Sequence, residues 1–168
     1  MTPGGLEPYN DARHVIVGVG EAARAEHPQM LVTQALGSCV GLTLWDPMVR
    51  IGGMAHIMLP TSQDSNLLGH PSRFASTAVP LLVEMLLEAG CPKRRLIAKL
   101  AGGSAMFKGV DGVSIGGRNI AEVRARLESL GIPLRAEDTG GSHARTIELH
   151  LDTGILLVRS YTYGLRSI

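Results

Sequence analysis

Apolar and polar residues follow two different periods along the chain, and these periods predict which segments form strands and which form helices. Short runs that are rich in β-branched residues, or that alternate between apolar and polar residues, are typical of strands. Clusters of Gly, Pro, Asp and Ser separate these runs and are typical of turns. The predicted strands cover residues 14–19, 31–33, 40–45, 51–59, 96–100, 146–151 and 155–159.

Two other segments carry apolar residues at helical spacing. The first predicted helix covers residues 73–89 and ends at Gly90, and Pro80 is expected either to kink it or to mark its true start. The second helix is expected to be capped by Asn119 and to end before Gly131. Each helix would present one apolar stripe to a core.

The order of these elements predicts the fold class. Strands outnumber helices, and there is neither strict βαβ alternation nor an internal repeat. Two pairs of strands are separated by short turns that begin at Asp46 and Asp152, and each pair is predicted to be an antiparallel hairpin. We therefore predict an α+β fold of layered, mostly antiparallel strands. Residues 1–12 are expected to be a mobile lead, and residues 13–168 to form a single domain.

Composition and charge exclude several classes of function. The 168 residues are 45% hydrophobic and 18% charged, which is sufficient for a core and unlike a disordered chain. The net charge is +1 and basic residues are dispersed apart from the run Lys93-Arg94-Arg95, so we expect no nucleic-acid partner. No segment reaches the roughly 20 apolar residues that a membrane helix needs. We therefore expect a cytoplasmic protein without membrane insertion.

Two common ligand motifs are not supported. A dinucleotide-type glycine spacing occurs in residues 18–23, GVGEAA, but no helix fits between it and Pro28 and no acidic residue follows at the required distance. The six histidines show no paired ligand spacing, and Cys39 and Cys91 lie far apart. We therefore predict no cofactor and no metal. Both cysteines are expected to be free thiols, and Cys91 is assigned a structural role.

Cys39 is a candidate nucleophile because of its position. It follows Gly37-Ser38 where the strand 40–45 begins, and a sharp turn there can aim the thiol while leaving backbone N–H groups free to bind an oxyanion. His56 lies in the predicted partner strand, where it can face Cys39 directly and take the thiol proton. A buried hydrophobic cysteine and a hydrogen-bonded core histidine would fit the same pattern, so the local sequence leaves both interpretations open.

A catalytic base usually needs a partner that holds its tautomer. Thr33, at the end of the predicted strand 31–33, offers a hydroxyl close to this point of the chain. Asp46 is the alternative, although its place before Pro47 is typical of a turn former. Thr33 would also be an ordinary strand residue if no base were present.

These residues lie within longer motifs that resemble the CheD family of chemoreceptor glutamine deamidases. The motifs are LGSCV (36–40), WDP (45–47), IGGMAH (51–56), MLP (58–60), AKLAGGSAMF (98–107), IGGRN (115–119), Gly140-Gly141 and Arg145. The resemblance runs from about residue 15 to residue 158, nearly the whole chain. Ala55 and Ala144 depart from it, because a polar residue and a glycine are expected there.

The resemblance implies a fold, an activity and partners. The fold would be a three-layer α/β/β sandwich. Carried over position by position, the nucleophile is Cys39, the base is His56 and the orienting residue is Thr33. The activity would be hydrolysis of glutamine side-chain amides on methyl-accepting chemotaxis receptors, through a thioester, to glutamate and ammonia. A CheC-type phosphatase would be a regulatory partner.

Two other functions are compatible with these residues. A non-catalytic adaptor would keep the fold and bind receptors or the phosphatase without turnover. A cysteine peptidase or amidase would use the same thiol and base on a different amide. The intact set of Cys39, His56 and Thr33 argues against the adaptor.

Overall fold

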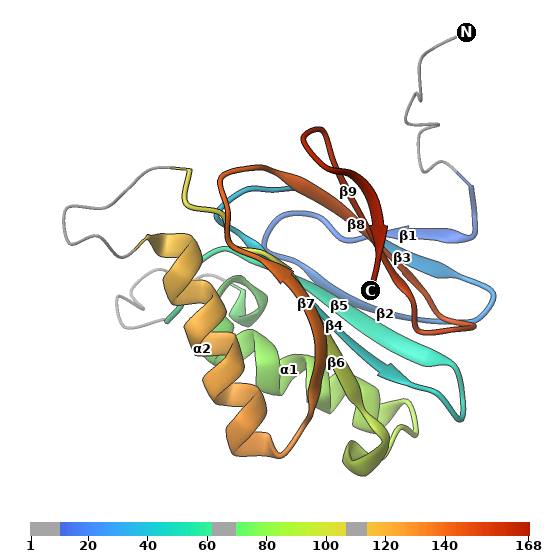
Figure 1. Ribbon diagram of the computed structural model, residues 1–168. Coiled ribbons are helices and arrows are strands. Elements are labelled where there is room, and N and C mark those ends of the chain that lie inside the picture. The colour runs from blue at the N-terminus through green and yellow to red at the C-terminus, as the bar shows by residue number, and fades with distance from the viewer. Residues whose placement is uncertain (1–10, 62–69, 107–113) are drawn as a thin grey trace, which may run out of the picture.

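The computed structural model of the chain describes residues 11–61, 70–106 and 114–168. Within these ranges two α-helices cover one face of a five-stranded sheet, and the other face of that sheet packs against a second five-stranded sheet (Figure 1). The predicted α+β fold, a three-layer α/β/β sandwich with two main helices, is therefore confirmed. Most of the segment 1–12, for which the sequence predicts mobility, lies outside the described residues.

We call the sheet against the helices the central sheet and the other one the outer sheet. Neighbouring strands are antiparallel in both sheets, except for one parallel pair in each, so the mostly antiparallel arrangement is also confirmed. In order across it, the central sheet contains β2 (Ala22–Glu26), β5 (Ile51–Ile57), β4 (Val40–Asp46), β6 (Ile97–Gly102) and β7 (Leu134–Thr139). The outer sheet contains β1 (His14–Ile16), β3 (Met30–Leu36), β8 (Arg145–His150), β9 (Leu156–Ser160) and β10 (Gly164–Ser167).

Both predicted helices form, but the start of the second one differs from the prediction. Pro80 lies inside the first helix and so does not mark its start. Asn119 does not cap the second helix, because Ser114 is its N-cap and accepts a hydrogen bond of 3.0 Å from the N–H of Gly117. The adjacent glycines 116 and 117 have low helix propensity, so propensity alone does not predict this first turn of the helix. The helices are α1 (Ala75–Glu88) and α2 (Ile115–Leu130), with short 3-10 helices η1 (Pro71–Arg73) and η2 (Lys93–Arg95).

Three strands, β2, β7 and β10, have no clear strand pattern in the sequence. β2 consists of small and charged residues, AARAE, and β10 is exposed along its whole length. All three lie at a sheet edge, since β2 and β7 border the central sheet and β10 borders the outer sheet. An edge strand is held by pairing with one neighbour and needs no continuous apolar face, so its sequence carries little signal.

Alternation along the central strands divides the apolar side chains between two cores. On one face, Leu42 and Leu44 of β4 pack with Leu82 of α1. On the other face, Met54 of β5 packs with Ile147 of β8, in the layer between the two sheets. Each fully buried leucine contributes about 2 kcal/mol by leaving water. The chain therefore has a core on each side of the central sheet.

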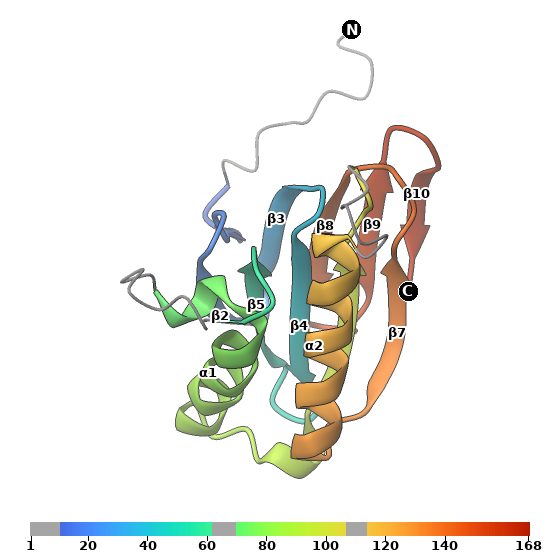
Figure 2. The same cartoon turned by 90° about the vertical axis from the view of Figure 1, so that its left-hand side faces the viewer.

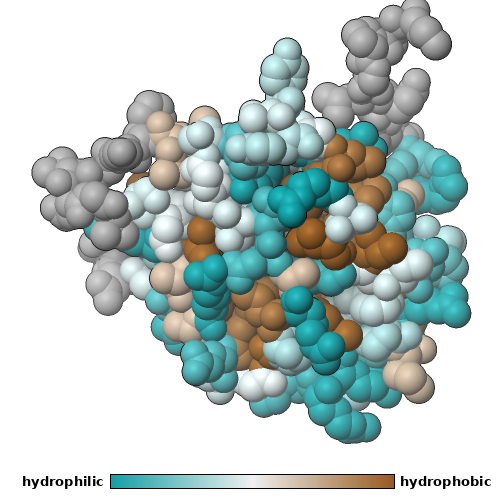
Figure 3. Space-filling model, in the orientation of Figure 1, coloured by the Kyte–Doolittle hydropathy of each residue, from teal (hydrophilic) through white to brown (hydrophobic). Residues whose placement is uncertain are grey.

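The surface shows no single dominant apolar region on the face seen in Figure 3, where polar side chains interrupt the apolar patches. The exposed large apolar side chains of the described residues come from separate elements and loops, among them Met48, Met106, Ile115, Tyr161 and Leu165. None of the helices in the described ranges has the length and the hydrophobicity that crossing a membrane requires.

Candidate active site

The connection between β3 and β4 carries Cys39 from the outer sheet to the central sheet. Only residues 37–39 separate the two strands. The pairing of β3 with β8 is irregular between Thr33 and Leu36, and Ala35 has a φ of 58°, so the strand bends just before this crossing. Cys39 is half-buried, and its side chain packs against the core between the two sheets.

His56 lies on the face of β5 that points toward the outer sheet. The predicted hairpin of β4 and β5 is confirmed, and its register pairs Val40 with Ile57 and Gly41 with His56. The expectation that His56 faces Cys39 directly is therefore wrong in register, because Gly41 stands opposite the histidine and Cys39 lies two residues earlier, just before β4 begins. His56 is 1% exposed. The register places the thiol and the imidazole at the same end of the layer between the sheets.

Thr33 of β3 contacts His56 from the outer sheet. Its Oγ1 is 2.7 Å from Nδ1 of His56 and donates a hydrogen bond of 2.6 Å to the carbonyl oxygen of Val17. A hydroxyl has one proton, and a carbonyl can only accept, so the proton of Thr33 is committed to Val17. Oγ1 must then accept a hydrogen bond from Nδ1–H. A neutral His56 consequently carries its proton on Nδ1 and its free lone pair on Nε2.

Burial shifts the pKa values of both His56 and Cys39. Nε2 of His56 is buried and has no hydrogen-bond partner among the described residues. Burial lowers the pKa of His56. Burial also raises the pKa of Cys39, and the backbone N–H of the same residue offsets this in part. Both shifts favour the neutral imidazole and the neutral thiol over the ion pair.

Asp46, the alternative partner for the base, lies at the far end of β4 from Cys39. One of its carboxylate oxygens accepts a hydrogen bond of 2.9 Å from the N–H of Met48, and the guanidinium of Arg95 donates to both oxygens at 2.8–3.1 Å. The bond from Met48 lies within the β4–β5 turn, which is the role that the place of Asp46 before a proline indicates, and the bonds from Arg95 tie the turn to η2. Asp46 is thus not brought to His56.

Cys91 is fully buried and interacts with Asp46, also at the far end of β4. The two cysteines are free thiols that lie at opposite ends of this strand, too far apart for a disulfide. The described part of the chain contains no cluster of three or more His, Cys, Asp or Glu side chains that could hold a metal ion.

Hydrogen bonds hold the carbonyl groups of the connection that carries Cys39. The carbonyls of Gly37 and Cys39 accept from the N–H groups of Ser104 and Gly103 at 2.9 and 2.8 Å. The carbonyl of Ser38 between them accepts from a side-chain amide of α2 at 3.0 Å. Within the described ranges, the N–H groups of Ser38 and Cys39 donate to no other backbone group. Peptide units fixed at their carbonyl ends, with N–H groups that bind no other backbone group, suit the binding of an oxyanion.

Glycine is required where β6 meets this connection. Gly102 pairs with Val40 and has a φ of 99°, a left-handed conformation that disfavours any residue with a Cβ. A Cβ at this position would also overlap the carbonyl oxygen of Cys39. The absence of a side chain at Gly102 thus lets β6 approach the candidate nucleophile closely.

Comparisons with known proteins identify the family. The family model described as CheD chemotactic sensory transduction matches residues 58–160. The chemoreceptor glutamine deamidase CheD of Thermotoga maritima is 46% identical over 89% of this chain and 93% of its own length. A protein of Geobacter metallireducens named "Probable chemoreceptor glutamine deamidase CheD 2" is 45% identical over 92% of this chain and 98% of its own. The chain belongs to the CheD family. The resemblance noted in the sequence is thereby confirmed.

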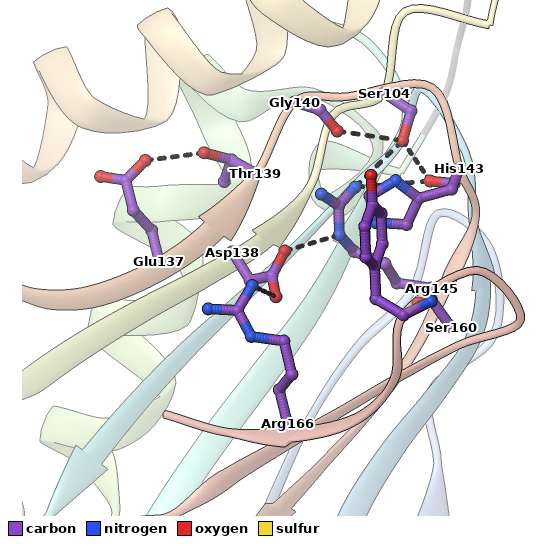
Figure 4. A network of polar contacts seen from close by, with 10 residues as sticks. Ser104, Glu137, Asp138, Thr139, Gly140, His143, Arg145, Ser160 and Arg166 are labelled. Atoms are coloured by element: carbon purple, nitrogen blue, oxygen red, sulfur yellow. Dashed lines mark hydrogen bonds and ion pairs between the residues drawn. The ribbon is translucent and has the colours of Figure 1, made fainter.

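A buried polar network supports the segment AKLAGGSAM (98–106) of this CheD-family chain, which we call the glycine-rich block (Figure 4). Arg145 is 3% exposed and donates hydrogen bonds to Asp138 at 2.9 Å and to the hydroxyl of Ser104 at 3.0 Å. The same hydroxyl donates to the carbonyl of His143. Because the N–H of Ser104 binds Gly37, the network ties the loop before β8 to the connection that carries Cys39. The sequence motifs include Arg145 and Ser104, but nothing local identifies Asp138 as the partner of Arg145.

The two departures from the CheD-family motifs occupy different environments. Ala55 is fully buried on the helix-facing side of β5, the side opposite His56, where an apolar residue suits the core. Ala144 is exposed in the loop before β8, between His143 and Arg145. The ring of His143 stacks edge-on against Tyr163 with 4.7 Å between their centroids. The substitution at 144 therefore belongs to a surface loop that the buried network anchors.

Proposed function

We propose that this CheD-family chain is a chemoreceptor glutamine deamidase with Cys39 as nucleophile, His56 as base and Thr33 as the residue that orients the base. The observation that carries the proposal is the Thr33–His56 hydrogen bond in the same layer as the Cys39 thiol. The names of the relatives support the substrate, a glutamine side-chain amide of a methyl-accepting chemotaxis receptor. The reaction would take place in the cytoplasm and would need neither a metal nor a cofactor.

The first half of the reaction forms a thioester. Nε2 of His56 takes the proton of the Cys39 thiol while Sγ attacks the carbon of the glutamine amide. The electron pair of the C=O double bond moves to oxygen, and the N–H groups of Ser38 and Cys39 bind the resulting oxyanion. The imidazolium then gives its proton to the amide nitrogen, the C–N bond breaks, and ammonia leaves. Cys39 is left acylated and His56 neutral.

The second half hydrolyses the thioester. Nε2 of His56 takes a proton from water as the water oxygen attacks the thioester carbon. The same N–H groups bind the second oxyanion, the C–S bond breaks, and the proton returns to the Cys39 sulfur. The product is a glutamate side chain on the receptor. From a neutral resting pair, charge develops during the reaction, in the oxyanion intermediates and in the transition states that lead to them, where the fixed peptide N–H groups stabilise it.

Apolar side chains near the nucleophile offer a contact for the receptor. Met106 is 48% exposed, and its Cγ would be 3.7 Å from a Cβ placed on Gly37. Ile115, the first residue of α2, is 47% exposed. An apolar rim next to a polar site suits the surface of an amphipathic receptor helix that presents a glutamine.

The family also suggests a regulatory partner. We propose a CheC-type phosphatase as a binding partner, supported by the family alone.

Two other functions would use the same fold. A non-catalytic adaptor would bind receptors without turnover, and an amidase of another class would act on a different amide. The buried, hydrogen-bonded His56 near a free thiol favours an enzyme over the adaptor, since a binding surface needs neither.

The proposal is tested by peptide mass spectrometry of a cognate receptor's cytoplasmic fragment after incubation with the protein. We expect wild type to convert specific glutamines to glutamates, and Cys39→Ser and His56→Ala to leave them unchanged. Cys91→Ser is the matched control and should keep full activity, because Cys91 lies at the other end of β4. Binding of the receptor without any mass change by wild type would support the adaptor, and cleavage of the fragment would support a peptidase.

A further inference from the structure

Asn119 is a fully buried polar residue whose position the helix-capping prediction does not explain. Its Nδ2 donates hydrogen bonds to the carbonyl of Ser38 at 3.0 Å and to the carbonyl of Met58 at 3.1 Å. Its Oδ1 is buried and has no hydrogen-bond partner among the described residues. One side-chain amide from α2 therefore joins the residue before Cys39 to the chain just beyond His56.

The bond to Ser38 determines the direction of the N–H group of Cys39. The carbonyl of Ser38 and the N–H of Cys39 belong to one peptide unit, which is planar and trans, so they point in opposite directions. A carbonyl that points to Asn119 turns the N–H of Cys39 away from α2. A hydrogen bond to the carbonyl also polarises the peptide and strengthens its N–H as a donor.

The packing of α2 brings Asn119 to this position. Gly116 lies on the same face of α2, one turn earlier, and a Cβ there would overlap the carbonyl oxygens of Gly103 and Ser104. The start of α2 therefore lies directly against the glycine-rich block. Figure 2 shows this start of α2 at the same end of the sandwich as the β3–β4 connection.

We propose that Asn119 is a positioning residue that orients the Ser38–Cys39 peptide, so that the N–H of Cys39 binds the oxyanion formed during deamidation. This inference rests on the proposed function and adds a residue to its machinery. Within the described residues, the side chain of Asn119 makes no hydrogen bond to the thiol of Cys39 or to the imidazole of His56. It acts through the peptide that it holds. An aspartate at 119 would be isosteric but would place a carboxylate oxygen against two carbonyl oxygens, which repel it.

The test compares Asn119→Ala and Asn119→Asp with wild type in receptor deamidation and in alkylation of Cys39 by iodoacetamide. Alkylation needs the thiolate but no oxyanion site, so it reports on the thiol alone. We expect kcat for deamidation to fall roughly 10- to 100-fold in both variants, as for weakening of one oxyanion donor, while KM changes less than about twofold. The alkylation rate should stay within about threefold of wild type.

Val123→Ala is the matched control. Val123 is a fully buried residue of α2 in the helix-side core, so its truncation also destabilises the helix packing but leaves Ser38 bonded. This variant should keep the wild-type kcat. If Asn119→Ala and Asn119→Asp keep the wild-type kcat, or if alkylation falls in parallel with deamidation, the positioning role is wrong. Asn119→Asp conserves volume, so it covers the case in which the alanine variant does not fold.

An NMR readout separates this inference from the proposed function. In ¹⁵N-labelled protein the amide proton of Cys39 should shift in both Asn119 variants and stay in place in Val123→Ala, because only the former lose the bond to Ser38. If wild type fails to deamidate the receptor, the proposed function is wrong. The shift of the Cys39 amide signal then tests by itself whether Asn119 orients the Ser38–Cys39 peptide. A Cys39 amide signal that does not respond to either Asn119 variant would refute the inference whatever the activity.

Discussion

Replacement of Thr33 by valine tests whether this residue sets the tautomer of His56. Valine has nearly the same shape but no hydroxyl, so the change removes the contact of 2.7 Å to Nδ1 of His56 and the bond of 2.6 Å to the Val17 carbonyl. Both partners are buried, at 1% and 2% exposed. Each buried polar group left without a partner costs about 1–3 kcal/mol, so the free energy of unfolding should fall by about 2–6 kcal/mol.

The effect of Thr33→Val on the reaction follows from the same bond. The hydrogen bond that selects the Nδ1–H tautomer contributes a net of about 0.5–1.5 kcal/mol, which corresponds to roughly a 2- to 12-fold change in population. Loss of the ring's orientation adds to this. We expect kcat for receptor deamidation to fall about tenfold with little change in KM, because Thr33 holds the base and not the substrate.

The assay is single-peptide mass spectrometry of receptor deamidation over time, combined with ¹⁵N NMR of the His56 ring, which distinguishes the two tautomers. Thr33→Ser is the matched control, because it keeps the hydroxyl and loses only a methyl group of about 1 kcal/mol. It should retain the Nδ1–H tautomer and most of the kcat. If Thr33→Val shows wild-type kcat and the same ring nitrogen signals, Thr33 does not orient the base.

Three further results are expected. Gly102→Ala should lower both kcat and the free energy of unfolding, because the new Cβ overlaps the carbonyl of Cys39. Gly90→Ala is the control, since Gly90 has a similar φ of 90° but no neighbouring atoms within reach of an added Cβ, and it should lower the free energy of unfolding alone. Equal kcat in both variants would contradict the steric argument. Asp46→Asn should lower the free energy of unfolding by about 1–3 kcal/mol in urea titrations through the weakened bonds to Arg95, and leave kcat unchanged below the melting temperature. Burial lowers the pKa of His56, so the folded state binds a proton less readily than the unfolded state, and stability should be lost as pH falls below the ordinary value of 6.5. The stability difference between wild type and His56→Gln should therefore shift against wild type from pH 7 to pH 5, and a difference independent of pH would rule this out.

Local pattern was sufficient for most of the elements and for the candidate residues. The long periodic segments, such as α1 and the hairpin of β4 and β5, follow directly from their apolar spacing. The pattern does not predict the edge strands β2, β7 and β10, because they are held by pairing and not by an apolar face. It predicts a cap at Asn119 because polar residues near a helix start are usually caps, whereas the hydrogen-bond partners of Asn119 are 81 and 61 positions away in the chain.

The sequence by itself determined the fold class and the family, and it supplied the candidate set Cys39, His56 and Thr33, because these depend on residue types and their spacing. Tertiary structure alone decided how these residues relate to one another. Thr33 and His56 lie in different sheets, and only the packing of the sheets brings Oγ1 to Nδ1 and leaves Nε2 as the free lone pair. Tautomer, register and the direction of a peptide N–H are consequences of long-range contacts, which no local pattern encodes.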